Sequence, residues 1–511
     1  MSVHRIVLTG GPCGGKSSAV DELRDALAKE GVAMYFAPEV ATILFGGGCT
    51  FPGMDGKDKL IAFEVALTQL QQQIEASFTN IALSTRKPSV VIFDRGIMDN
   101  AAYLPKDGFE ELLAATGLSH DAILNSYDSV LHLVTAADGA EKFYKWGNVK
   151  DDAGKDVFRK ESPEEARELD RNMAAAWAAH PHVGRIENGG DFKEKMGRAV
   201  SFVLKRISEQ PGGASLQKDL EWLRYRPCPF SVHRNVLTGG PCGGKSSALE
   251  ELQKALAQEG VAAYCAPEVA TILFGGGCVF PGFDGKEELI AFELALTQLQ
   301  QQMENSFTRI GLSTGKPTII FFDRGILDNA AYLPEEGWQS LLSAAHLSQD
   351  EILSRYDSVL HLVTAADGAE KFYKWGNVKD DSGKDVYRKE SPEDARELDR
   401  KIAAAWAAHP SVGLIKNTGG IKEKLAQAAE FILDQVEALP IRQMLKLLRM
   451  LDTKNEGSVD KERLMRILMK LDPILFTDIF LSMLFESAGM QECTRIQTGD
   501  FVSWLMTDVS V

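Results

Sequence analysis

A glycine-rich stretch that ends in a lysine and two serines occurs twice in the 511-residue sequence. TGGPCGGKSS fills residues 9–18 and returns unchanged at 238–247. Both copies fit G-x-x-x-x-G-K-[ST], in which backbone N–H groups wrap a phosphate, the lysine reaches the β- and γ-phosphates and the hydroxyl holds Mg²⁺. A tight turn without a ligand is the alternative. The residues expected to bind the nucleotide are Gly10, Gly11, Gly14, Gly15, Lys16, Ser17 and Ser18, with Gly239, Gly240, Gly243, Gly244, Lys245, Ser246 and Ser247 in the second copy.

An acid followed by an arginine ends an apolar run in each copy, in VVIFDRG at 90–96 and IIFFDRG at 319–325. In an open α/β sheet, ligands bind at the carboxyl ends of the strands. Asp94 and Asp323 are therefore suited to hold Mg²⁺ through water, beside Ser17 and Ser246, or to accept a proton from an acceptor. Arg95 and Arg324 would grip an anionic group. A solvated salt pair is the alternative.

A glutamate follows another predicted strand in each copy, within APEVAT. Glu39 and Glu268 would either orient a hydroxyl of the acceptor or cap the next helix. The glycine run FGGGC at 45–49 is interpreted as a substrate loop or as an ordinary connection.

The charged stretch at 141–171 predicts a lid, because phosphoryl transfer builds negative charge that cations on a closing segment can stabilise. A solvated face is the alternative. The candidate cations are Lys145, Arg159 and Arg167, with Lys374, Arg388 and Arg396 in the second copy.

Alternating strands and helices must position these groups. Apolar runs predict strands at 6–8, 32–36, 89–93 and 129–134, and the spacing of Val20, Leu23 and Leu27 predicts a helix over 17–30. Strands without strict polar alternation, separated by helices, indicate a parallel sheet covered on both faces. The predicted fold class is α/β, with two P-loop NTPase domains.

Shifting the sequence by 229 positions aligns the two copies as whole domains. The predicted boundaries are a first P-loop domain at 1–209, a linker at 210–230, a second P-loop domain at 231–438 and a small all-α module at 439–511. Asn235 replaces Ile6 at a central strand, so the second copy is predicted to be the less stable.

The C-terminal module resembles an EF-hand, because DTKNEGSVDKER at 452–463 has Gly457 at loop position six and lies between apolar helical stretches. Lys454 and Arg463 stand where calcium ligands are needed, so a packing or partner-binding module is favoured over a Ca²⁺ sensor.

The net charge, the cysteines and the apolar runs of the sequence exclude some classes of protein. The net charge of −16 and pI near 5.2 argue against a general nucleic-acid binder. Seven scattered cysteines, no leader-like start and no apolar run of about 20 residues favour a cytoplasmic protein without a transmembrane segment.

The order of motifs, P-loop, PEVAT, FDRG, HLVTAADGAEKFY, RKESPEEARELD, AAAWAAHP and a late IEN, resembles the P-loop AAA-type domain shared by NadR and the TRPL translocation defect protein family. The resemblance covers about four-fifths of the chain. It implies a nucleotide-binding domain, a kinase for a ribosylated nicotinamide in one branch and GTP and acidic-lipid binding in the other. It also places Asn188 and Asn417 near the base. No CYTH-type barrel pattern and no N-K-x-D guanine motif is present.

The leading hypothesis is a tandem phosphotransferase or NTPase that binds Mg²⁺ with ATP or GTP in each half and acts on a small-molecule acceptor. The alternative is a nucleotide-dependent switch with little turnover whose tail recruits a protein partner. A third hypothesis is a duplicated scaffold in which one copy has lost turnover.

Overall fold

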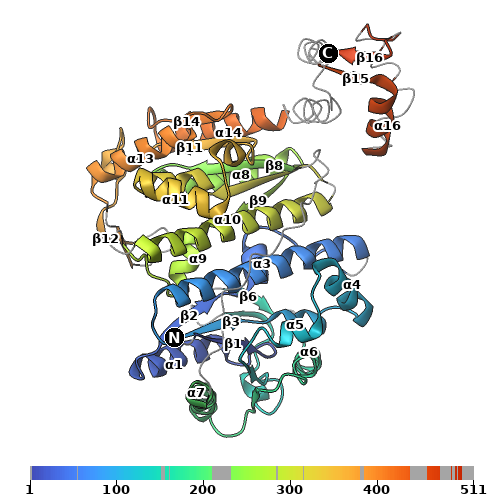
Figure 1. The fold of residues 1–511 in the computed structure, drawn as a ribbon, viewed down its shortest axis with the longest axis vertical. Coiled ribbons are helices and arrows are strands. Elements are labelled where there is room, and N and C mark those ends of the chain that lie inside the picture. The colour runs from blue at the N-terminus through green and yellow to red at the C-terminus, as the bar shows by residue number, and fades with distance from the viewer. Residues whose placement is uncertain are drawn as a thin grey trace.

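Each repeat folds around a five-stranded parallel sheet in this computed structural model (Figure 1). The structure describes residues 3–53, 56–150, 156–159, 161–209, 232–282, 286–314, 316–379, 385–388, 390–437, 457–471, 481, 485, 489–491 and 493–497. The strand order is β2-β3-β1-β4-β7 in the first copy and β9-β10-β8-β11-β14 in the second. The strand that precedes each P-loop therefore lies at the centre of its sheet.

The first copy follows the predicted order of elements. Its sheet contains β1 (Val3–Thr9), β2 (Ala33–Ala37), β3 (Ser89–Asp94), β4 (Ser129–Leu133) and β7 (Val183–Ile186). Its helices are α1 (Lys16–Lys29), α2 (Val40–Gly46), α3 (Lys57–Ser84), η1 (Ile97–Ala102), α4 (Lys106–Thr116), α5 (His120–Leu124), η2 (Glu141–Phe143), α6 (Pro163–Ala176) and α7 (Phe192–Glu209). A hairpin of β5 (Gly147–Lys150) and β6 (Asp156–Arg159) lies between η2 and α6.

The second copy repeats these elements. Its sheet contains β8 (Val232–Thr238), β9 (Ala262–Ala266), β10 (Thr318–Asp323), β11 (Ser358–Leu362) and β14 (Val412–Ile415), and its hairpin is β12 (Gly376–Lys379) with β13 (Asp385–Arg388). Its helices are α8 (Lys245–Gln258), α9 (Val269–Gly275), α10 (Lys286–Thr314), η3 (Ile326–Ala331), α11 (Glu335–Ala345), α12 (Gln349–Leu353), η4 (Glu370–Phe372), α13 (Pro392–Trp406) and α14 (Ile421–Glu437).

Both faces of each sheet are buried, as the apolar runs predict. In β1, Ile6 and Leu8 pack with residues of α1 and α7, whereas Val3 and Val7 pack with residues of α3 on the opposite face. Successive side chains of a strand point to opposite faces, so a strand with apolar residues at consecutive positions needs a helical layer on each side. The expectation of two α/β P-loop domains is confirmed.

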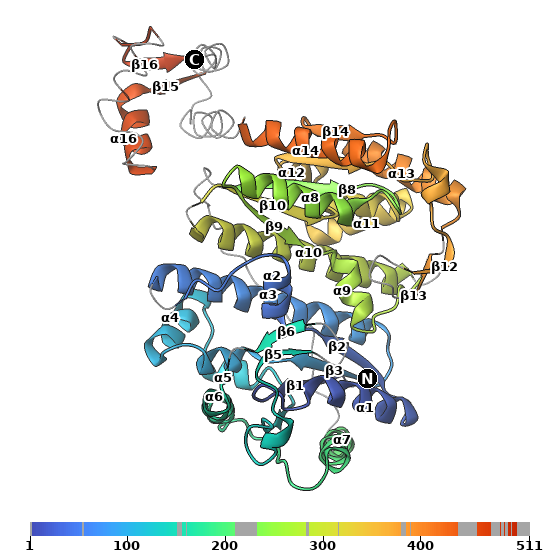
Figure 2. The same cartoon turned by 180° about the vertical axis from the view of Figure 1, so that it is seen from behind.

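The two copies pack against each other through their longest helices, α3 and α10, which lie side by side in both views (Figures 1 and 2). The contact is reciprocal. The Ser77 hydroxyl donates to the Ala295 carbonyl at 3.0 Å, and the Ser306 hydroxyl donates to the Ala66 carbonyl at 2.9 Å. Small polar side chains thus bond across the interface between the two helices.

The glycine run after α2 joins this interface. The Cys265 N–H of β9 donates to the Gly47 carbonyl at 2.8 Å, and the Phe36 N–H of β2 donates to the Gly276 carbonyl at 2.8 Å. A Cβ atom at Gly47 would lie 2.4 Å from the Cys265 carbonyl oxygen, which is too close for any other residue. Each run therefore bonds to the edge strand of the other copy, a contact that neither interpretation of FGGGC predicts.

The amide that distinguishes β8 from β1 is buried and only half satisfied. Asn235 is fully buried, its Nδ2 donates to the Ser358 hydroxyl at 2.7 Å, and its Oδ1 has no hydrogen-bond partner among the described residues. Ile6 occupies the matching position in the first copy without such a group. The lower stability predicted for the second copy has a structural basis here.

Asn235→Ile is expected to stabilise the second copy by about 1–3 kcal/mol, because it removes an unsatisfied buried acceptor. Thermal unfolding of the full chain should show the transition of the second copy rising by several degrees. The matched change Ile6→Asn should lower the transition of the first copy. An unchanged or lowered transition in Asn235→Ile would show that the amide is stabilising where it stands.

The C-terminal region is described only in part. β15 (Ser458–Asp460) pairs antiparallel with β16 (Arg495–Gln497), so that Val459 faces Ile496, and α16 spans Lys461–Leu471. Residues 452–456 of the proposed calcium loop, Lys454 among them, lie outside the described residues, as does the linker at 210–230. The prediction of an all-α module at 439–511 is wrong, because β15 and β16 form a small antiparallel sheet there. The EF-hand assignment stays a prediction. Within the described part of the chain, no helix combines the length and apolar character that crossing a bilayer requires.

Candidate functional site

The phosphate loop of the first copy joins the central strand β1 to helix α1. Gly10 has a φ of 127° and Gly15 a φ of 93°, and the non-glycine Cys13 also adopts a positive φ of 57°. A Cβ atom at Gly10 would lie 2.1 Å from the Leu133 carbonyl oxygen. The glycines therefore allow both the turn and the close approach to β4, in the strand–loop–helix setting that a P-loop requires.

An aspartate from α6 holds this loop from behind. The Gly11 N–H donates to Asp170 Oδ1 at 2.7 Å, the Thr135 N–H donates to the same oxygen at 3.1 Å, and His132 Nε2 lies 3.2 Å from Oδ2. Burial alone would raise the pKa of Asp170, but these hydrogen bonds outweigh it and lower the pKa. The Gly11 N–H, expected to face phosphate, is directed to Asp170 in this structure.

The P-loop lysine lies over the loop. Lys16 Nζ donates to the Gly10 carbonyl at 3.0 Å, and Lys245 Nζ donates to the Gly239 carbonyl at 3.2 Å. Burial, followed by the nearby charge of Arg95, lowers the pKa of Lys16 to about 8. A partly buried cation bonded only to carbonyl oxygens is suited to exchange them for phosphate oxygens.

The predicted magnesium carboxylates carry unsatisfied oxygens. Asp94 Oδ1 and Asp323 Oδ1 are buried and have no hydrogen-bond partner among the described residues. Burial raises the pKa of Asp94 to about 6, although Lys16 opposes the shift. An unsatisfied carboxylate oxygen at the strand end and the exposed Ser17 at the start of α1 fit Mg²⁺, which takes few protein ligands and keeps waters and phosphate oxygens.

The predicted arginine and glutamate form a partly buried pair. Arg95 Nε donates to Glu39 Oε1 at 2.6 Å, and the guanidinium carbon lies 5.7 Å from the centroid of the Tyr103 ring. Burial would raise the pKa of Glu39, but Arg95 and a hydrogen bond from Thr42 lower it. Arg95 has a φ of 72°, a strained conformation typical of functional sites.

The second copy repeats this pair. Arg324 Nε donates to Glu268 Oε1 at 2.8 Å, and its φ is 74°. Glu39 and Glu268 each stand at the N-cap position of a helix, but neither side chain makes a capping hydrogen bond. The capping interpretation is therefore wrong for these side chains, and the arginines are paired and largely buried, so they are not members of a solvated salt pair.

The cationic residues predicted to form a lid do not all lie in the same kind of environment. Arg167 Nη1 donates to the Ala137 carbonyl at 2.7 Å, and Arg396 Nη1 donates to the Ala366 carbonyl at 2.8 Å, so both brace the turn that follows the fourth strand. Lys145 and Lys374 each present a carbonyl oxygen 3.8 Å from the P-loop cysteine sulfur. The side chains of Arg159 and Arg388 lie outside the described part of the chain. The lid stays a prediction.

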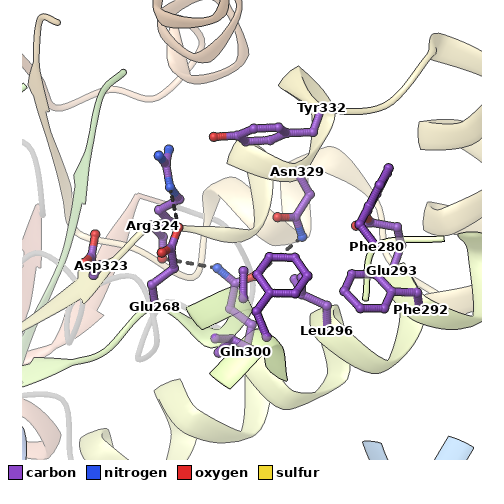
Figure 3. Close-up of a pocket in the computed structure, with 13 residues that line it drawn as sticks. Glu268, Phe280, Phe292, Glu293, Leu296, Gln300, Asp323, Arg324, Asn329 and Tyr332 are labelled. Atoms are coloured by element: carbon purple, nitrogen blue, oxygen red, sulfur yellow. Dashed lines mark hydrogen bonds and ion pairs between the residues drawn. The ribbon is translucent and has the colours of Figure 1, made fainter. Parts of the chain in front are cut away.

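A cavity of about 210 Å³ opens beside the arginine–glutamate pair of the second copy (Figure 3). Asp323, Arg324 and Glu268 form its polar end, and the rings of Phe280 and Phe292 lie at the other end, next to Glu293. The remaining lining residues are Val269, Ala270, Phe274, Leu296, Gln300, Asn329 and Tyr332. We call this cavity the acceptor pocket.

Glu293 is the unexpected member of the acceptor pocket. The residue is 5% exposed, makes no hydrogen bond or ion pair with a described residue, and has a pKa that burial raises to about 7. A carboxyl group buried without a partner destabilises the fold when it ionises, so its presence favours a ligand-binding role.

Glu293→Gln is expected to stabilise the chain by on the order of 2–3 kcal/mol at pH 8 and by much less at pH 5. The folded-state pKa of about 7 exceeds the ordinary value of 4.5, so this group's contribution to stability is lost as the pH rises from 4.5 to 7. Denaturant unfolding at both pH values measures the effect, with the exposed Glu250→Gln of α8 as control. An equal effect at both pH values would contradict the assignment.

Three side chains that hold the site were not predicted. Asp99 accepts from the Thr9 hydroxyl at 2.6 Å and from Trp177 Nε1 at 3.0 Å, and Lys195 Nζ donates to the Gly14 carbonyl at 2.8 Å. Asp170 is the third. A usable signal existed for Asp170, because it shares the buried face of α6 with Ala166 and Met173. An acid at the spacing of an apolar helix face indicates a buried polar role.

Comparisons with known proteins agree with this geometry. The family model AAA_28, described as an AAA domain, matches the chain twice, over residues 5–195 and 234–424. The two matches cover about three quarters of the chain. No curated protein matches the sequence.

Two solved structures are similar to the chain. A NadR protein in complex with NR has 13% identity and a TM-score of 0.26, over 84% of this chain and 96% of that one. A protein assigned as polyphosphate kinase 2 from Pseudomonas aeruginosa PA01 has 9% identity and a TM-score of 0.23, over 86% and 91%. With the family matched once in each half, the chain belongs to the AAA domain family as a tandem pair of P-loop domains.

Proposed function

We propose that the chain is a phosphotransferase that binds a Mg²⁺-nucleotide in each P-loop and transfers the terminal phosphoryl group to a hydroxyl of a small molecule. The observation that carries the proposal is the acceptor pocket, because Asp323 and Arg324 line it and stand at the carboxyl end of β10, the strand next to the P-loop strand. A cavity that shares its polar end with the phosphate site can hold a second substrate in line with the first.

Each residue of the second copy has a proposed role in the transfer. The acceptor oxygen attacks the terminal phosphorus, the bond to the bridging oxygen breaks, and Asp323 receives the hydroxyl proton. Lys245 and Arg324 stabilise the charge on the phosphate oxygens. Ser246 and one oxygen of Asp323, the latter through water, would hold Mg²⁺, which neutralises phosphate charge when bound. Lys16, Ser17, Asp94 and Arg95 take these roles in the first copy.

The walls of the pocket define the class of acceptor. The rings of Phe274, Phe280 and Phe292 form an apolar wall, while Glu293 and Asn329 offer polar groups. A flat ring that carries hydroxyl groups fits this combination. The resemblance to the NadR branch makes nicotinamide riboside the first acceptor to test, with other nucleosides beside it.

A phosphorylation assay tests the proposal. The full chain is incubated with Mg²⁺, ATP or GTP and a panel of hydroxylated ring compounds, and a phosphorylated acceptor is sought by mass spectrometry. We expect at least one acceptor to be phosphorylated at a rate well above nucleotide hydrolysis alone. Tight nucleotide binding with negligible turnover under every acceptor would contradict a transferase and favour the nucleotide-dependent switch.

A further inference from the structure

A second cavity, of about 240 Å³, lies against the P-loop of the second copy. Its walls include Cys242 and Gly243 of the loop, Phe372 of η4 and Ile421 at the start of α14. It shares no lining residue with the acceptor pocket. A nucleotide whose phosphates occupy the loop can therefore extend into this second cavity and leave the acceptor pocket open.

The polar side chains of this cavity are already occupied. Asn417 Nδ2 donates to the Thr364 carbonyl at 2.8 Å and the Asp367 carbonyl at 2.7 Å, and its Oδ1 accepts from Lys424 Nζ at 2.8 Å. Lys424 Nζ also donates to the Val363 carbonyl at 2.6 Å. Asn417 lines the cavity, as the resemblance implies for a residue near the base, but its amide is engaged in bracing the turn. A ligand here meets mainly apolar surface.

Exposed apolar side chains provide that surface. Phe372 is 64% exposed and Ile421 is 54% exposed, and both line the cavity beside the glycine-rich loop. A planar ring that faces solvent next to a phosphate site is a stacking surface for a nucleotide base, since every base has a π-face.

The two copies differ at one of these side chains. The P-loops are identical in sequence, and Phe143 of the first copy, like Phe372, is 64% exposed. Where the second copy has Ile421, however, the first has Phe192, which is 53% exposed. Its ring lies beside the loop, because a Cβ atom at Gly15 would be 3.0 Å from Phe192 Cε2.

We propose that this cavity holds the base of the bound nucleotide, and that the side chain at 192 or 421 sets how tightly each copy binds it. The inference rests on the proposed nucleotide binding and adds a specificity-determining residue to it. The first copy offers two rings to the base, and the second offers one ring and an isoleucine. An aromatic pair adds a modest attraction beyond burial, so the first copy binds nucleotide about three- to tenfold more tightly.

Reciprocal substitutions test the assignment. Calorimetric titration of the full chain with Mg²⁺ and a non-hydrolysable ATP analogue should resolve two sites in the natural protein. Phe192→Ile should weaken the tighter site by about three- to tenfold, and Ile421→Phe should strengthen the weaker site by a similar factor. Each new side chain is the one that the other copy carries at that position, so the fold already accommodates it.

A titration with inorganic tripolyphosphate, which lacks a base, separates the contribution of the base to affinity from that of the phosphates. The affinity for tripolyphosphate should be the same in all three proteins, which also shows that the P-loops remain folded. Unchanged affinities for the ATP analogue in both variants would overturn the base assignment and leave the proposed nucleotide binding intact. If neither the analogue nor tripolyphosphate bound the natural protein, the proposed function itself would be wrong.

Discussion

The double variant Lys16→Met, Lys245→Met is expected to transfer phosphate about 100- to 1000-fold more slowly than the natural chain. Each lysine is partly buried above its loop and donates only to carbonyl oxygens of that loop. Methionine is unbranched and nearly as long as lysine, but it lacks the charge that would stabilise the terminal phosphate oxygens in the transition state. The measurement is the initial rate of acceptor phosphorylation at saturating nucleotide.

Single variants divide the activity between the copies. If both copies turn over, each single variant, Lys16→Met or Lys245→Met, should retain only the transfer rate of the copy that is not substituted. Lys29→Met, at an exposed position in the last turn of α1, is the matched control and should leave the rate unchanged. A double variant that retains more than a few per cent of the rate would show that the lysines are not part of the transfer site.

Arg95→Lys together with Arg324→Lys is expected to slow transfer by on the order of 100-fold, while nucleotide affinity stays close to the natural value. The guanidinium of Arg95 is fixed by Glu39 at 2.6 Å and lies over the Tyr103 ring. An ammonium keeps the charge but loses the planar shape that this pairing orients. The lowered rate should therefore appear in kcat, with a smaller change in KM for the nucleotide.

Arg24→Lys, on the exposed face of α1, is the control for a loss of guanidinium at the surface. A second comparison uses Glu39→Gln with Glu268→Gln, which should slow transfer less because the amide still accepts a hydrogen bond from arginine. If the arginine variant lost nucleotide affinity by the same factor as it lost rate, the arginines would act in ground-state nucleotide binding, and their proposed role in stabilising the phosphate charge during transfer would be wrong.

Local patterns were sufficient to predict four of the five strands of the first sheet and the edge at which the site lies, but not the edge strand β7 or the β5–β6 hairpin. The strand preceding Gly10, the helix beginning near Lys16 and the apolar run ending at Asp94 are each encoded within about a dozen consecutive residues. Because parallel strands align their carboxyl ends, those segments bring the loop, the acid and the arginine together without further information.

The supports of the site depend on contacts between distant residues, which one sequence does not reveal. Gly11 and Asp170 are separated by 159 positions, and their hydrogen bond exists only because α6 crosses behind the loop. The hydrogen bond from the Cys265 N–H to the Gly47 carbonyl joins the two P-loop domains. Packing of this kind depends on side-chain shape across whole elements, so periodicity indicates that a residue is buried but not what it contacts.

The acceptor pocket illustrates the same limit. Glu293 lies in a helix whose periodicity is largely apolar, and nothing in its immediate sequence separates it from an ordinary polar position. Its role emerges only when α9, α10 and η3 enclose it with Phe280 and Tyr332. Near-identity of the two copies adds no information there, since Glu64 stands at the matching position of the first copy and is equally buried.

The number of nucleotides bound per chain tests the central claim most directly. Equilibrium dialysis of the full chain against Mg²⁺ with ATP, and separately with GTP, should give saturable binding of two nucleotides per chain for at least one of them. The double variant Lys16→Met, Lys245→Met should bind with markedly lower affinity. No saturable binding of either nucleotide at millimolar concentration would contradict the account, whatever the acceptor.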